Sequence, residues 1–288
     1  MIVFALDLTL ETSSFGFQGV GMSVATGWGG TSFLSGIDGL SVNPSLLVDS
    51  APKQVVLGGT SLYGDGFVFY GGFIGKRWGV YAKTYAITGI PFTTLPYDVN
   101  QDGIIDESDL TAFNRPVVSS YKTMWNIQVK GGLAKKISEV NAGVAVSLVS
   151  SFISGYYGGG LLVDTGVSGS SHLFDWALVL KGLPNFFYWS TGRFEVGVPS
   201  VSVEVSREYN FLKGVYAFSA RPFLNVDSTY GVSGGAYLRK KWFSLALSYS
   251  DLGFGAGVSF DYLKYHLSYV LTLWDVGASH WLSFAMRI

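Results

Sequence analysis

The strictest constraint in this sequence is an alternation of residue types that runs through its last quarter. In 243–250, large apolar or aromatic residues alternate with serine or alanine at every step. Segments 264–274 and 279–288 follow a similar alternation. Side chains in a β-strand point to opposite faces in turn. Each segment is therefore predicted to be a strand with one apolar, aromatic face and one small or polar face.

The distribution of aromatic residues favours a membrane barrel over a soluble sheet. Aromatic residues make up 16% of the chain and charged residues only 14%, whereas soluble domains carry about 25% charged residues. A soluble core of this size rarely has so many Tyr and Trp on one face and so many Ser and Gly on the other. A barrel in a bilayer has this pattern by construction, because its outer face contacts lipid and its inner face lines a polar or packed lumen.

Net charge and cysteine content exclude several other classes. The net charge is −1, so nothing indicates binding to nucleic acid. The chain has no cysteine, which excludes disulfides and thiolate metal sites. Two uncharged segments, 12–37 and 141–163, are long enough for membrane helices. Their many Gly and Ser residues argue against the helical interpretation.

From residue 54 onward, alternation and turn residues divide the chain into about fourteen strands. Single-chain bacterial barrels have an even number of strands, so residues 54 and 288 are expected at the same rim and the longest connection, 89–120, outside the cell. The predicted fold class is all-β: a transmembrane antiparallel β-barrel of residues 54–288 in the bacterial outer membrane. The strands are expected near 54–62, 66–74, 77–88, 121–134, 139–153, 158–168, 172–183, 192–206, 212–224, 230–240, 242–250, 255–262, 264–274 and 279–288.

Residues 1–53 differ from the strands that follow them. They contain many glycines between Gly16 and Gly39 and end shortly after Asn43-Pro44-Ser45. A glycine-rich segment with an Asn-Pro-small residue motif directly before a barrel resembles the FadL-like outer-membrane transporters of hydrophobic compounds and their PorV-like relatives. In that family the motif is usually Asn-Pro-Ala, and the segment folds inside the barrel. The resemblance implies an N-terminal glycine-rich plug, although Asn43-Pro44 alone also fits a plain turn.

The first residues of the chain contain a candidate cleavage site for export. Val3-Phe4-Ala5 has the small-residue spacing of a signal-peptidase site, although no basic region precedes it. One hypothesis is that residues 1–5 are the remnant of an export signal. The alternative is an ordinary first strand at 2–10.

One predicted strand, 192–206, changes face within its length. The apolar residues up to Val198 stand at even-numbered positions, whereas those from Val201 onward stand at odd-numbered positions. Proline cannot donate a hydrogen bond to a ladder, and the extra residue of a β-bulge restores the register. A bulge is expected at Pro199-Ser200. The alternative is that one strand ends at Val198 and another begins.

The parity of the strands also predicts which charged residues face the lumen. Charges of both signs are expected there, where they can pair with each other and anchor a plug, because the lipid face is too costly for them. The predicted lumen-facing charges are Asp164, Asp175, Arg193, Glu195, Glu204, Arg221, Arg239, Lys264 and Arg287.

The connection 89–120 contains a match to the EF-hand calcium loop at 98–109. Ca²⁺ binds several hard oxygen ligands, and the spacing of this loop places them around one ion, with Gly103 at the sharp turn. The last ligand position holds Asp instead of Glu, which resembles the loops of dockerin modules, although a dockerin has two such loops. The alternative is a solvated acidic turn. The predicted Ca²⁺ ligands are Asp98, Asn100, Asp102, the carbonyl of Ile104, Asp106 and Asp109.

No residues are assigned as an active site, and the chain is not predicted to be an enzyme. His266 and Ser268 share a face, but residues two apart in a strand are too distant for a Ser–His pair. Asp164 and Asp175 face each other across a predicted turn and are candidates for acid–base chemistry. Pairing of these carboxylates with Arg or Lys in the lumen is the simpler interpretation.

The family resemblance implies passage of small hydrophobic compounds across the outer membrane through a plugged barrel. A mostly apolar pocket above the plug, lined by Tyr81 and Tyr85, is expected to hold such a ligand. Three other functions stay open: a porin for polar solutes, a PorV-like scaffold for exported proteins, and a barrel enzyme. The lipid bilayer is the expected partner in each case.

Overall fold

The computed structural model describes residues 30–50, 53–62, 66–93, 114–115, 117–211, 218–229, 231–251, 253–274 and 277–288. No helix within these residues is long and apolar enough to cross a membrane. The fold is all-β, with seventeen strand segments in one antiparallel sheet. Helix α3 (Gly36–Val42) and the 3₁₀-helix η1 (Pro44–Asp49) precede the sheet.

The segments form fourteen barrel strands. Segments β7 and β8 lie end to end along β6 as one strand, and β9, β10 and β11 follow one another as the next strand. The bounds are β1 Gln54–Leu62, β2 Gly66–Ile74, β3 Trp78–Thr93, β4 Val118–Ile137, β5 Val140–Ile153, β6 Tyr156–Ser170, β7 Asp175–Lys181, β8 Asn185–Trp189, β9 Phe194–Val196, β10 Ser200–Ser206, β11 Tyr209–Phe211, β12 Phe218–Asp227, β13 Gly231–Lys240, β14 Phe243–Ser250, β15 Gly253–Tyr262, β16 Tyr265–Trp274 and β17 Gly277–Arg287.

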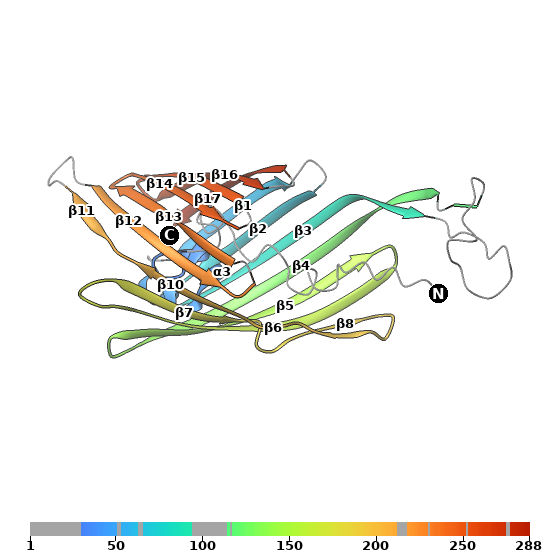
Figure 1. Ribbon diagram of the computed structural model, residues 1–288, viewed down its shortest axis with the longest axis horizontal. Coiled ribbons are helices and arrows are strands. Elements are labelled where there is room, and N and C mark those ends of the chain that lie inside the picture. The colour runs from blue at the N-terminus through green and yellow to red at the C-terminus, as the bar shows by residue number, and fades with distance from the viewer. Residues whose placement is uncertain are drawn as a thin grey trace.

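The sheet closes on itself because β1 pairs with both β2 and β17. Gln54 lies opposite Arg287, so the barrel begins and ends at one rim, called here the terminal rim. This confirms the predicted closed barrel with an even number of strands. Figure 1 shows the β3–β4 hairpin projecting beyond the other strands at the opposite rim. The predicted calcium loop 98–109 follows β3 and lies outside the described residues.

Alternation sorts the side chains between lipid and lumen as predicted. In β14, Leu247 and Tyr249 are exposed on the outside, whereas Ser248 is buried inside. Trp281 departs from the rule of small inner residues, because it points inward and is 1% exposed. Aromatic rings pair on the outside near the terminal rim, for example Tyr265 with Phe284 at 5.7 Å. Such rings are typical of the interfacial girdles of membrane barrels.

Two strand boundaries differ from the predictions. Strand β3 continues to Thr93 and β4 begins at Val118, so the connection 89–120 is shorter at both ends. The two strands extend because they pair with each other beyond the rest of the rim. Segment β8 lies between the predicted strands 172–183 and 192–206, where no strand was predicted. The chain after Pro184 pairs again with β6.

The change of face in 192–206 corresponds to a break in the ladder. Segment β9 pairs with β8 and β10 pairs with β7, while residues 197–199 belong to neither segment. Val196 and Val198 are 71% and 79% exposed, and Val201 is exposed after the break. The interruption falls where the parity of the apolar residues changes. It is the predicted alternative, in which one strand segment ends and another begins, and not the expected bulge at Pro199-Ser200.

Residues 30–50, called here the lumenal segment, lie inside the barrel. Figure 1 shows α3 enclosed by the strands. Leu40 and Leu47 are fully buried in an apolar cluster that includes inner residues of strands as far apart as β2, β5 and β14. Glycine on the wall makes room for the segment: a Cβ at Gly132 would lie 2.5 Å from the Leu40 side chain, and one at Gly143 would lie 2.4 Å from the Pro44 backbone.

Candidate functional site in the barrel lumen

Glu204 on β10 holds the start of the lumenal segment. It occupies an inward position of an alternating strand and is fully buried. Its carboxylate accepts hydrogen bonds from the backbone N–H groups of Thr31 (3.0 Å) and Ser32 (2.9 Å), and from the Ser32 hydroxyl (2.6 Å). Burying a carboxylate is costly unless its oxygens receive such donors. The carboxylate and the turn at 31–33 therefore stabilise each other.

The Asn-Pro-Ser motif fixes the middle of the segment. The Asn43 side chain accepts hydrogen bonds from the backbone N–H (3.0 Å) and hydroxyl (2.8 Å) of Ser45, and donates one to the carbonyl of Thr31 (2.7 Å). Asn43 thus caps the start of η1. The Ser45 hydroxyl lies 2.8 Å from that of Ser168 on β6. Ser45 therefore makes a direct contact with the wall of the barrel.

Lys130 joins the wall to the segment a second time. Its ammonium lies 2.6 Å from the Asp164 carboxylate of β6 and donates to the carbonyl of Ser41 (3.1 Å). Both charged side chains are buried. Since a buried charge is stable only when it is paired and hydrogen-bonded, this pair and Ser41 form one connected anchor.

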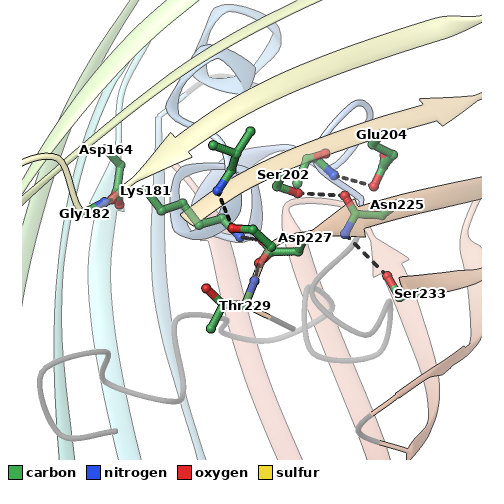
Figure 2. Close-up of polar contacts among 12 residues, drawn as sticks. Asp164, Lys181, Gly182, Ser202, Glu204, Asn225, Asp227, Thr229 and Ser233 are labelled. Atoms are coloured by element: carbon green, nitrogen blue, oxygen red, sulfur yellow. Dashed lines mark hydrogen bonds and ion pairs between the residues drawn. The ribbon is translucent and has the colours of Figure 1, made fainter. Parts of the chain in front are cut away.

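A band of polar contacts crosses the inner wall where β7 ends (Figure 2). Lys181 pairs with Asp227 of β12 at 3.0 Å. The backbone N–H of Gly182, a residue with a positive φ of 67°, donates to Asp164 at 2.8 Å. Ser202 donates to Asn225 at 2.7 Å. These contacts stabilise the wall beside the break in its ladder.

Phe33 docks the segment on the other side of the lumen. Its ring centre lies 5.6 Å from that of Phe223 and 5.5 Å from that of Tyr237. The Arg221 guanidinium lies 5.3 Å from the same ring centre and pairs with Asp175 at 3.2 Å. The lumenal segment is thus bonded to opposite sides of the barrel.

The predicted lumen charges are partly confirmed. Asp164 and Glu204 are buried inside and anchor the segment, and Asp175, Glu195 and Arg221 form ion pairs. Lys264 was placed wrongly, because it lies in the turn before β16 and its ammonium lies over the Tyr265 ring. The parity argument missed four buried charges on the strands: Lys83, Lys130, Lys181 and Asp227.

The structure does not bring the catalytic candidates together. His266 contacts Asp261 at 3.2 Å, whereas the Ser268 hydroxyl bonds to that of Ser283. Asp164 and Asp175 each have their own cationic partner. This agrees with the interpretation of the two carboxylates as lumen charges paired with Lys or Arg.

No family model and no curated protein matches the sequence. The fold is similar to solved structures of outer-membrane channels at low sequence identity. The CymD monoaromatic hydrocarbon channel aligns with a TM-score of 0.57 and 11% identity, over 94% of this chain and 98% of that chain. A TodX monoaromatic hydrocarbon channel mutant aligns with a TM-score of 0.54 and 10% identity, over 94% and 99%.

These similarities, the closed barrel and its lipid-facing exterior define the class of the protein. It is a bacterial outer-membrane β-barrel. It shares the barrel fold of FadL-family hydrocarbon channels, and part of its N-terminal region lies inside the lumen.

Proposed function

We propose that this protein carries small hydrophobic compounds across the outer membrane and that the lumenal segment is its plug. The observation that carries the proposal is the apolar cluster inside the lumen, in which Leu40 and Leu47 of the segment pack against the wall. Apolar side chains do not support a continuous column of water through the lumen, whereas they can contact an apolar solute. The neighbours with the same fold, CymD and TodX, are described as monoaromatic hydrocarbon channels.

The break between β9 and β10 supplies a route out of the lumen. Residues 197–199 belong to neither segment, and on the adjacent strand the ladder is interrupted between Lys181 and Asn185. Val196, Val198 and Leu183 are exposed on the outer face beside this break. An apolar solute that leaves here enters lipid directly, and small shifts of the wall suffice because few ladder bonds have to break.

Two measurements on the intact protein test the proposal. Planar bilayers should show low ion conductance, and cells that express the barrel should take up toluene faster than cells without it. Substituting Asn43 by Ala, which removes the cap of η1, should reduce uptake and leave the barrel heat-modifiable. Large, steady single-channel currents from the wild type would reject the plugged transporter and favour a porin for polar solutes.

A further inference from the structure

Cationic residues are concentrated on one part of the terminal rim. The whole chain is almost neutral, with nineteen Lys and Arg against twenty Asp and Glu. Where the strands from β13 through β17 and from β1 to β5 meet this rim, however, nine cations stand beside only two described carboxylate side chains, Glu139 and Asp261. These cations, called here the basic arc, are Lys53, Lys76, Arg77, Lys135, Lys136, Lys240, Lys241, Lys264 and Arg287.

The basic arc is one continuous edge, because each turn is bonded to the next. Gln54 lies opposite Ile74 in the ladder, so Lys53 adjoins the turn that carries Lys76. Backbone N–H groups donate to carbonyls across the other junctions, at 2.8 or 2.9 Å, from Ala134 to Arg77, from Ile288 to Lys53, from Arg287 to Lys264 and from Asp261 to Trp242. The cations therefore follow one another around the rim.

Almost all of these charges lack an anionic partner within the protein. Arg287 pairs with Asp261 at 3.2 Å, and among the described residues no carboxylate forms an ion pair with the other eight. Most of the side chains are exposed, whereas Lys240 is half-buried on the outer face opposite Phe243. Like charges on a short edge repel one another, so anions that lie along the arc are stabilised there.

Aromatic rings place the basic arc at the depth of lipid headgroups. Trp242 stacks on Phe260 with ring centres 6.3 Å apart, and the Lys264 ammonium lies 5.5 Å from the centre of the Tyr265 ring. Outward Trp and Tyr of membrane barrels lie at the interface between hydrocarbon and water. Lysine and arginine beside them extend their charged ends further toward water. The arc is therefore level with the phosphates.

The lengths of the connections indicate which leaflet this is. The turns of the arc are short, whereas the connection 94–117 leaves from the opposite rim. Membrane barrels have short turns on the periplasmic side and long loops outside the cell, so the basic arc faces the periplasmic leaflet, which consists of phospholipid. The turns Ser154-Gly155 and Ser228-Thr229 of the opposite rim carry no charge.

We propose that the basic arc binds the headgroups of anionic phospholipids, such as phosphatidylglycerol, in the leaflet that meets the terminal rim. Groups of Lys and Arg directly beside a membrane-spanning segment are typical of anionic-lipid recognition. The neighbouring aromatic rings favour lipid over an acidic protein, because rings at this depth contact the glycerol and acyl regions. This interaction goes beyond the proposed transport function and does not depend on the transported compound.

Quenching of tryptophan fluorescence by brominated lipids measures the preference. The purified full chain is reconstituted into phosphatidylcholine vesicles that contain brominated phosphatidylglycerol or, as the reference, brominated phosphatidylcholine. Trp78 and Trp242 are exposed at the arc and report the lipids bound there. We expect phosphatidylglycerol to bind at least about threefold better, because one cation near an anionic surface contributes about fivefold. Added NaCl should reduce this preference.

Charge variants assign the preference to the basic arc. The triple variant Lys76→Gln/Lys135→Gln/Lys264→Gln should lose most of it, whereas the same three positions changed to Arg should retain it. Arg115→Gln/Arg193→Gln removes two exposed cations outside the arc and should have no effect. Heat-modifiability shows that each variant is folded.

Two results would overturn the proposal. Equal quenching of the wild type by the two lipids would reject lipid recognition and favour an acidic protein as the partner of the arc. A preference that is unchanged in the triple Gln variant would show that the arc does not bind the lipid. Inorganic phosphate, compared with NaCl at the same ionic strength, should not displace phosphatidylglycerol. Displacement would indicate a site for free anions instead.

Discussion

At the scale of single residues, the inner wall relies on a few charges whose partners come from distant parts of the chain. Lys130 contacts both Asp164 and the carbonyl of Ser41, and Glu204 contacts the turn at 31–33. Each charge is acceptable inside the barrel only because a partner stands opposite it. Removing one partner is thus expected to cost more than removing both.

Lys130→Met tests this expectation. The substitution leaves the Asp164 carboxylate buried without its cation, and breaking a buried pair in this way costs about 3–5 kcal/mol. The double variant Lys130→Met/Asp164→Leu should regain part of that loss. The free energy of unfolding in urea, measured after refolding into vesicles, gives both values. A double variant less stable than the single one would contradict the pairing.

Glu204→Ala addresses the hold on the lumenal segment. Three donors from Thr31 and Ser32 lose their acceptor, and a hydrogen bond to a charged group contributes about 1.5–3 kcal/mol. The segment should loosen, and planar bilayers should show larger and more frequent current steps than the wild type. Glu139→Ala, at an exposed turn of the terminal rim, is the matched control. Traces as quiet as those of the wild type would show that Glu204 does not hold the lumen closed.

At the scale of elements, alternation predicts well which face of a strand points outward and predicts poorly where the strand ends. Which side of β14 or β16 meets lipid follows from the period of two in a strand, and the structure confirms it. Where β3 ends depends on how far its neighbour β4 continues, which is not encoded in either strand alone. The pairing of Lys130 with Asp164 was equally out of reach, because it requires the register of β4, β5 and β6 together. The inward position of Glu204 could be predicted from the sequence, because Glu204 alternates with valines that are exposed on the outer face.

The loop 98–109 carries a prediction at this same scale. Asp98→Ala or Asp102→Ala should abolish Ca²⁺ binding, because each removes a side-chain oxygen from the EF-hand pattern. The barrel should stay folded, since long surface insertions are well tolerated. Calorimetry with millimolar Ca²⁺ measures binding, and Asp65→Ala serves as the control outside the motif. If the loop is only a solvated acidic turn, the wild type itself should release no heat of Ca²⁺ binding. That result would reject the calcium hypothesis.

At the scale of the whole molecule, the bilayer decides which substitutions the barrel tolerates. Leu271 faces outward on β16 and Thr272 faces the lumen. Leu271→Arg puts a charge into lipid, which costs about 2–4 kcal/mol near the midplane. Thr272→Arg puts the same charge on the polar side and should impair refolding less. Equal refolding yields of the two variants in vesicles would refute the assignment of inside and outside.

The pairing of β1 with β17 also bears on how a cell makes this protein. The first barrel strand meets its second neighbour only when the last strand has been synthesised and delivered. Contacts between such distant segments form slowly because the intervening chain has to be ordered first. Until then β1 has an unpaired edge, and open edges recruit strands of other chains. Assembly of this barrel therefore requires that the free edge of β1 stays unpaired until the last strand arrives.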